Sequence, residues 1–476
     1  MSIIKSALLG SAAVIAVVAG AQAADLPSKK AAPATYVKIC DAYGAGFFYI
    51  PGSETCVRLG GYVRAEYQYV PGKNTINPTA TTAATVIQQS ASTQAETGYE
   101  VRGRIDVDAR TPTSAGAVRT FVRLRAANTS GIRNSTITDR GLTGTAGTTQ
   151  TGYGQSDAST TGITIESAMV QWAGFTFGVA PENYAMMPSM MYQANPWTGF
   201  PNGMKQIAYT AALGGGISAT LALEDRTDFG YNQTAFDQPQ TAANLVANVR
   251  LDQGWGFAAV HAMVGNNSIT RASVDGGVGQ KTYSGWAIGS TVNLKLPMIA
   301  AGDQIWITAN YADGALGALL SRGGMSNMST SSNHRLLGGI MRLDSNVVQT
   351  NAVTGAASAT NVYAYDTATG WNLSMAATHY WSPNWRSNVS AGYVEINPPT
   401  VAAGAPLTWG KGKLWEVTGS LIYSPTKDFD IGLEVQYANI KNALQNASTT
   451  NQWALAGSPG LNESNVTTKL RVQRGF

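Results

Sequence analysis

Charged side chains recur at every second position in three stretches near the start of the chain. From Tyr99 to Arg110 the even positions carry arginine, aspartate or glutamate, and the odd positions carry apolar residues or glycine. The stretches Val57 to Val70 and Ala117 to Asn128 alternate similarly. The charged residues are Arg58, Arg64, Arg102, Arg104, Arg110, Arg119, Arg123 and Arg125, with Glu66, Glu100, Asp106 and Asp108. Arginine stays ionised, so this set suits a hydrated basic surface.

A period of two identifies the elements that must carry these residues as β-strands, because successive side chains of a strand point to opposite faces. A soluble sandwich with its apolar face inward is one interpretation. The other is a membrane barrel whose apolar face meets lipid. Charges on a lipid-facing surface cost several kcal/mol near the bilayer centre, so in a barrel the charged face must line a water-filled lumen.

The first residues predict export. Lys5 precedes an apolar run from Ala7 to Val18, and Ala21-Gln22-Ala23 forms an A-x-A cleavage site, which together predict a signal peptide over residues 1–23. The run is shorter than the roughly 20 residues that a membrane-spanning helix needs. Without Lys5, the chain after the predicted signal peptide has 31 basic and 28 acidic residues. This net charge of +3 does not indicate a nucleic-acid partner.

The amino-acid composition limits the structural class of the protein. Charged residues make up 13% of the chain, against roughly 25% in ordinary soluble domains. The chain has 52 glycines, 20 tyrosines and 11 tryptophans. This balance is typical of a membrane β-barrel, although secreted β-solenoids and adhesins share much of it.

The two cysteines, Cys40 and Cys56, predict a structural disulfide, because exported proteins oxidise their cysteines. The sequence has no C-x-x-C motif and no histidine near either position, which argues against a metal site. We therefore expect residues 24–56 to form a periplasmic N-terminal segment that the disulfide closes. Residues 57–476 would then form the barrel.

The rest of the chain alternates short turns with long polar connections. Sixteen strand-like segments lie between Val57 and Phe476. The long connections fall at about 71–97, 129–162, 181–204, 226–241 and 314–370. Within the last of these, His334 to Leu343 and Asn361 to Tyr365 could be strands or loop. The pattern predicts an all-β fold, a 16-stranded antiparallel transmembrane β-barrel with long extracellular loops and short periplasmic turns.

Three stretches resemble the trimeric porins of alphaproteobacteria. They are CDAYGAGFFYIPGSETCVRLGGYVRAEY from Cys40 to Tyr67, GDQIWITANYADGA from Gly302 to Ala315, and the ending KLRVQRGF. Arg474 departs from the apolar residue that bacterial barrels generally prefer there, but similar endings occur in this family.

This resemblance implies a passive diffusion channel in the bacterial outer membrane. It also implies a homotrimer, in contact with outer-membrane lipid and lipopolysaccharide, that passes small hydrophilic solutes and ions. Each barrel would have a pore narrowed by the third extracellular loop, and the terminal aromatic residue, Phe476, would serve as the assembly signal. Arg58, Arg64, Arg102, Arg104, Arg119, Arg123 and Arg125 would form the pore wall.

Residues 181–204 occupy the place of this constriction loop. Such loops usually set acids against the arginines, yet Glu182 is the only acid here. The loop instead carries Met186, Met187, Met190 and Met191. These methionines suit packing of the loop, which we favour, or a partly apolar constriction. The excess of arginine predicts a weakly anion-preferring or nearly unselective pore.

Other functions have less support. The histidines, His261, His334 and His379, form no catalytic or metal-binding grouping, and the sequence has no G-x-S-x-G or P-loop motif. We expect no enzyme activity, cofactor or metal, and interpret His261 and His379 as interface residues on apolar strand faces. A surface adhesin or receptor that uses residues 314–370 is one alternative. A substrate-specific channel with an aromatic track is the other.

Overall fold

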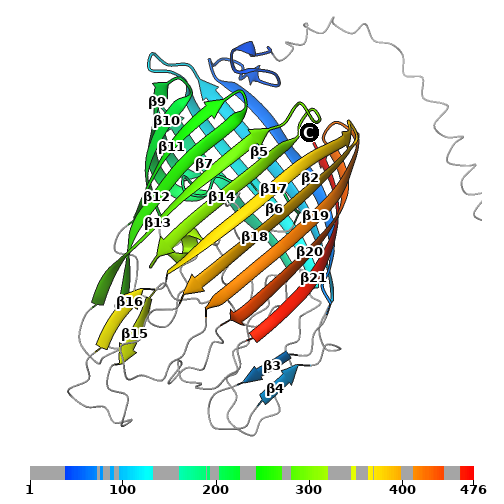
Figure 1. Cartoon of the computed structure of the whole chain (residues 1–476). Coiled ribbons are helices and arrows are strands. Elements are labelled where there is room, and N and C mark those ends of the chain that lie inside the picture. The colour runs from blue at the N-terminus through cyan, green and yellow to red at the C-terminus, as the bar shows by residue number, and fades with distance from the viewer. Residues whose placement is uncertain are drawn as a thin grey trace, which may run out of the picture.

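The protein is a closed antiparallel β-barrel (Figure 1). The computed structural model describes residues 38–71, 75–78, 86–89, 96–131, 160–188, 190–192, 203–225, 243–270, 280–319, 345–349, 363–367, 369–397, 411–443 and 461–476. The predicted signal peptide, residues 1–23, lies outside this part of the chain. In the described part, no helix is both long enough and apolar enough to cross a membrane.

Sixteen strands form the barrel wall, as the sequence predicts. They are β2 (Cys56–Tyr69), β5 (Thr97–Thr111), β6 (Val118–Gly131), β7 (Thr160–Trp172), β8 (Phe175–Ala180), β9 (Met204–Gly214), β10 (Ile217–Glu224), β11 (Asn244–Gln253), β12 (Gly256–Thr270), β13 (Gln280–Lys295), β14 (Gln304–Asp313), β17 (Thr369–Ser382), β18 (Trp385–Asn397), β19 (Gly412–Thr426), β20 (Phe429–Ala443) and β21 (Leu461–Gly475). Each pairs with its neighbour in this order.

Pairing of the last strand, β21, with the first, β2, closes the ring. Their register runs from Tyr62 opposite Gly475 to Tyr69 opposite Thr468. Beyond it, the backbones of Gly61 and Phe476 exchange two hydrogen bonds. A Cβ atom at Gly61 would lie 2.1 Å from the carbonyl oxygen of Arg104 and 2.9 Å from the Phe476 ring. The closing corner therefore requires glycine.

The outer face of the barrel is apolar. On β5, Val101 and Ile105 are exposed, whereas Glu100 and Asp108 on the other face are buried. Leu421, Leu433 and Leu470 lie opposite one another across three adjacent strands, and all three are exposed. The charged residues at alternate strand positions thus face inward, as the alternation predicts for a membrane barrel.

Connections at the two ends of the barrel differ in length. One end has short turns, such as residues 173–174, 215–216 and 254–255, and the other has the long connections. Two short hairpins lie within stretches predicted to be loops: β3 (Thr75–Pro78) with β4 (Val86–Gln89), and β15 (Ser345–Gln349) with β16 (Tyr363–Thr367). The candidate strand from Asn361 to Tyr365 overlaps β16, whereas that from His334 to Leu343 lies outside the described residues.

The N-terminal segment packs at the end with the short turns (Figure 1). It contains η2 (Asp41–Tyr43) and β1 (Phe48–Tyr49), which pairs with the start of β2. The predicted disulfide joins Cys40 to Cys56, and both cysteines are buried with Phe47. This segment covers the barrel rim beside β2.

An apolar core lies inside the barrel along β9 to β14. Small inward residues on these strands leave room for the turn η5 (Leu316–Ala318), whose Leu316 is fully buried with Leu319. The inward side chains of this core on β9 to β14 are Met204, Ala208, Ala222, Val246, Met263, Ala287 and Ala312, and the core continues across the interior to Val394, Ile396, Leu414 and Ala438 on β18, β19 and β20. Part of the barrel interior is therefore filled by close-packed apolar side chains.

We predict that Leu433→Arg lowers the free energy of unfolding by about 2–4 kcal/mol, because it places a charge on the lipid-facing surface near mid-strand. Denaturant unfolding in lipid vesicles measures this loss. Leu433→Met is the control, because it keeps the site apolar. Equal unfolding midpoints for the two variants would contradict a lipid-facing Leu433.

Candidate functional site

Inward-facing arginines of β2, β5 and β6 lie next to one another on three adjacent strands. Cross-strand partners are Arg64 with Arg102, Arg104 with Arg125, and Arg110 with Arg119. Like charges directly opposite each other repel. The arrangement is therefore stable only if carboxylates lie between the guanidinium groups.

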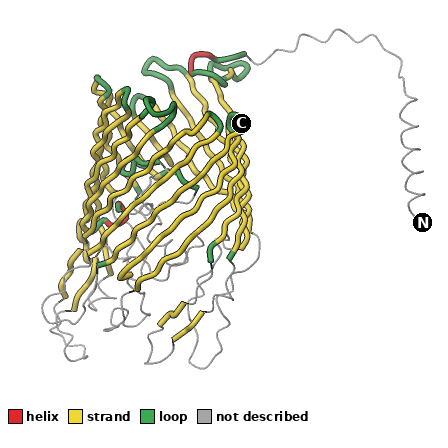
Figure 2. Tube along the Cα trace, turned by 45° about the vertical axis from the view of Figure 1, so that its right-hand side comes forward, coloured by secondary structure: helices red, strands yellow, loops and turns green. Residues whose placement is uncertain are grey.

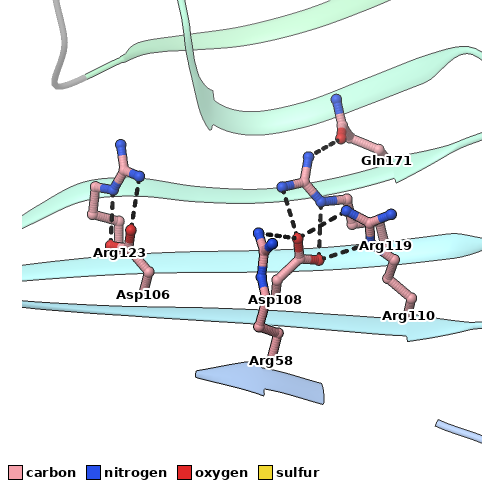
Figure 3. A network of polar contacts seen from close by, with 7 residues as sticks. All are labelled: Arg58, Asp106, Asp108, Arg110, Arg119, Arg123 and Gln171. Atoms are coloured by element: carbon pink, nitrogen blue, oxygen red, sulfur yellow. Dashed lines mark hydrogen bonds and ion pairs between the residues drawn. The ribbon is translucent and has the colours of Figure 1, made fainter. Parts of the chain in front are cut away.

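Asp108 is shared by three of these arginines (Figure 3). Arg119 donates two hydrogen bonds to it, at 3.0 and 3.1 Å, and Arg110 donates two more, at 3.1 and 3.0 Å. Arg58 adds an ion pair at 3.7 Å. Arg119 also donates to Gln171 on β7 at 2.8 Å. One buried aspartate thus holds three arginines at the end of the barrel with the short turns.

Asp106, two residues along β5, forms a second centre. Arg123 donates two hydrogen bonds to it, at 2.9 and 2.8 Å, and Arg104 lies 3.4 Å away (Figure 3 shows the first pair). Farther along β6, Arg125 pairs with Glu166 at 3.4 Å. Glu166 projects inward from a β-bulge where the register of β7 shifts. The ion pairs therefore continue from strand to strand.

Glu66 extends the network onto the closing strand, β21. It pairs with Arg471 at 2.5 Å, Arg64 at 3.6 Å and Lys469 at 3.7 Å. Glu166, Lys469 and Arg471 also belong to this network, although they are not among the charged residues predicted above. The alternation of Lys469, Arg471 and Gln473 in the last strand is the signal that could have identified two of them.

We call this surface the basic wall. It contains the eight predicted arginines and Lys469 and Arg471, ten cations in all, against five carboxylates, Glu66, Glu100, Asp106, Asp108 and Glu166. Two aromatic rings support the guanidinium groups: Tyr62 beneath Arg64 and Arg104, and Phe121 beneath Arg119 and Arg123. The wall is positively charged overall.

Residues 181–188 and 190–192 of the predicted constriction loop fold into the barrel (Figure 2). At the start of this segment, Asn183 donates a backbone hydrogen bond to Glu224 on β10 at 2.8 Å and a side-chain bond to Gln206 on β9 at 2.6 Å. Asn248 on β11 donates to the carbonyl oxygen of Asn183 at 3.0 Å. These bonds fix the beginning of the loop to β9, β10 and β11.

The next residues run along the opposite side, from β17 to β21. Asn388 on β18 donates to the carbonyl oxygen of Met190 at 2.9 Å. The backbone N–H of Tyr192 donates to Glu434 on β20 at 2.6 Å, and Lys469 and Arg471 donate to the carbonyl oxygen of Tyr192 at 3.1 and 3.0 Å. The loop therefore crosses the barrel interior from β9, β10 and β11 to β18 and β20, and it ends on two members of the basic wall, Lys469 and Arg471.

The methionines and tyrosines of this loop pack against the inner surface of the barrel strands. Met187 and Met191 are buried, and Met186 and Met190 are half-buried. Burial raises the pKa of Tyr192 to about 12. Burial, with the charge of Glu182, also raises the pKa of Tyr184. Both phenols stay neutral, so the half-buried Glu182 carries the only charge in residues 181–192.

Gly432 on β20 makes room for the Tyr192 side chain. A Cβ atom at this glycine would lie 1.9 Å from the Tyr192 hydroxyl oxygen. The Tyr192 ring also lies 4.0 Å from the guanidinium group of Arg471. Glycine at this inward position therefore lets the loop sit close to the barrel wall.

The structure does not support the interpretation of His261 as an interface residue. It is buried on the inner face, where its ring meets that of Tyr184 at 4.6 Å and accepts or donates a hydrogen bond with Thr291. The adjacent apolar residues belong to the interior core rather than the outer surface. His379 does lie on the outer-facing parity, 2.7 Å from Asp303. Within the described residues, no group of His, Cys, Asp or Glu could hold a metal ion.

The closed barrel, the apolar outer face and the loop that folds inside define a protein of the porin class. A family model described as a porin subfamily matches residues 25–465. The chain belongs to this family, and it is a protein of the bacterial outer membrane.

Curated relatives include the porin Omp2b of Brucella canis, 31% identical over 54% of this chain and 64% of the relative, and that of Brucella melitensis, with the same percentages. The chain thus spans just under two thirds of the length of these relatives. Among solved structures, the outer membrane channel DcaP of Acinetobacter baumannii is 16% identical, with a TM-score of 0.53, over 90% of this chain and 99% of that chain. This likeness shows the fold.

We predict that Glu434→Ala speeds backbone hydrogen exchange in residues 186–192 by about tenfold, because the Tyr192 N–H loses a charge-assisted hydrogen bond. Hydrogen exchange followed by mass spectrometry measures the change. Glu434→Gln is the control, since its amide oxygen still accepts this bond. Wild-type exchange in the alanine variant would mean that this contact does not hold the loop.

Proposed function

We propose that this protein forms a water-filled channel for the passive diffusion of small hydrophilic solutes and ions. The observation that carries the proposal is the division of the barrel interior. Residues 181–188 and 190–192 and the turn η5 lie along β9 to β20, whereas the basic wall covers β2, β5 and β6 and meets the loop only at Lys469 and Arg471 of β21. Solutes would pass between the loop and the basic wall, so residues 181–204 form the constriction.

The charge of the wall supports weak anion preference. Ten cations exceed five carboxylates, but the ion pairs neutralise much of the local field. Exposed pore charges are also screened within about 10 Å at 0.1 M salt. We assign the methionines to packing of the loop, because Met187 and Met191 are buried.

The proposed assembly is a homotrimer embedded in outer-membrane lipid and lipopolysaccharide. Residues 1–23 would be removed as the signal peptide, residues 24–56 would face the periplasm with the short turns, and the long connections would face outward. Phe476, 72% exposed beside the closing corner, is accessible for recognition during assembly. The family supports this arrangement.

A substrate-specific channel is the second candidate. Phe257 and Trp306 meet at 5.2 Å on the inner face near the short turns, and Arg250 stacks on Phe257 at 3.7 Å. Such a patch could bind the face of a sugar ring. In the described residues, however, aromatic contacts do not continue from this patch to the basic wall, so the general channel is favoured. Family membership also favours a channel over an enzyme.

We predict conductance in three equal steps per inserted trimer in a planar bilayer. In a salt gradient, the zero-current potential should indicate weak anion preference that declines as salt is raised, because the wall charges are screened. Strong cation preference would contradict the proposed role of the basic wall. Folded protein with no conductance would contradict the channel itself and favour an adhesin or receptor.

We predict that Arg104→Gln and Asp106→Asn shift the zero-current potential in opposite directions. The first removes a cation of the wall and should favour cations. The second removes a carboxylate and should favour anions, each by a few millivolts in a tenfold gradient because single pore charges are screened. Lys427→Gln is the matched control, since Lys427 lies in a turn outside the wall. Shifts of the same sign for both wall variants would contradict the assignment.

A further inference from the structure

The outer face carries a group of lysines where β18, β19 and β20 meet the long connections. Lys411 immediately precedes β19, Lys413 is the second residue of that strand, and Lys441 lies near the end of β20. Lys413 is directly opposite Lys441 in the strand register. Two like charges in this position repel each other, and folding alone gives no reason to place them there.

One carboxylate partly neutralises the group. Glu395 on β18 pairs with Lys411 at 2.9 Å and with Lys413 at 3.5 Å, and it accepts a hydrogen bond from Tyr393 at 3.0 Å. Lys441 faces Lys413 on one side and Asn462 on the other. Three lysines and one glutamate leave a net charge of +2.

The neighbouring connections add no compensating acid. Residues 398–410 and 444–460, which follow β18 and β20, contain no charged residue in their sequence. The lysines remain available to a ligand, because the side chains of Lys411 and Lys413 are 59% and 40% exposed. Lys441 is also exposed. This surface therefore has unbalanced positive charge that faces outward.

An aromatic belt marks the depth of this surface in the membrane. Trp371, Tyr393, Trp415 and Tyr437 lie on the outer parity of four adjacent strands, with ring contacts at 5.2 Å between the first two and 4.8 Å between the last two. Such belts lie at the level of lipid head groups. Lys413 is two residues beyond Trp415 toward the long connections, about 7 Å along the strand.

We propose that Lys411, Lys413 and Lys441, with Glu395 as their spacer, bind the phosphate of a phosphorylated glycolipid in the outer leaflet. Ammonium groups form charge-assisted hydrogen bonds to phosphate oxygens. The aromatic belt below them would contact the sugar and the upper acyl chains. The phosphate would relieve the repulsion between Lys413 and Lys441. This inference rests on the orientation proposed above, in which the long connections face outward.

The test is a lipid-binding measurement on the folded whole protein in detergent. Native mass spectrometry can titrate it with bisphosphorylated lipid A, dephosphorylated lipid A and inorganic phosphate. We expect Lys413→Gln with Lys441→Gln to weaken binding of the phosphorylated lipid by about fivefold for each lysine lost. Lys413→Arg with Lys441→Arg should retain binding, because the positive charge is kept.

Lys427→Gln is the matched control. It removes the same charge from the turn between β19 and β20, at the other end of the same hairpin, and should leave binding unchanged. Heat-modifiable migration in gels verifies that each variant is folded. Wild-type affinity in the double glutamine variant would overturn the proposal. Equal binding of dephosphorylated lipid A would also overturn it, as would complete competition by millimolar inorganic phosphate.

This measurement does not depend on channel activity. A protein that binds the phosphorylated lipid but conducts no ions would refute the proposed channel and leave the lysine site intact. If the protein conducts ions but substitution of these lysines does not change its affinity for the lipid, only the lysine site is refuted.

Discussion

The structure depends on one requirement: every backbone N–H and C=O group within the membrane needs a partner in the protein, because the hydrocarbon core offers none. A sheet can meet this requirement only by closing on itself. Here the closure pairs β21 with β2 and ends in the reciprocal bonds between Gly61 and Phe476. Residues more than 400 positions apart in the chain thereby become neighbours, and Glu66 acquires Arg471 as an ion-pair partner.

Closure also gives each strand an outer face toward lipid and an inner face toward the barrel interior, and the inner face is used in two different ways. On β9 to β14, small apolar side chains admit Tyr184, Leu316 and Leu319. On β2, β5 and β6, arginines lie opposite arginines, and the buried Asp108 and half-buried Asp106 keep them in place. The loop follows the packed half and connects it to β20 and β21. Its position is set by hydrogen bonds to wall residues far away in the sequence.

The sequence was sufficient for local features. The period of two located all sixteen wall strands, and the same alternation placed the arginines from Arg58 to Arg125 on the inner parity. The presence of two cysteines in a chain with a predicted signal peptide was enough to predict the disulfide. These inferences succeed because lipid and water impose opposite demands on successive side chains, and this demand is visible in a few neighbouring residues.

The features that the sequence did not reveal depend on long-range contacts. Glu166 joins the basic wall because a bulge turns it inward, and alternation does not predict a bulge. His261 was assigned to an interface because its neighbours are apolar, yet those neighbours form an interior core. The tethers from Asn183 to Glu224 and from Tyr192 to Glu434 join parts of the chain that only the closed ring brings together.

The interior core has a consequence for how the chain can vary. Along β9 to β14, side-chain volume decides whether a substitution is tolerated, because Ala222, Ala287 and Ala312 leave only the space that Leu316 and Leu319 fill. Across the barrel, a substitution is judged by its charge and hydration, and size matters less. The two regions of the barrel interior therefore tolerate different kinds of substitution. The charged surface of β2, β5 and β6 can change by exchange of residues while the packed strands that hold the start of the loop stay unchanged.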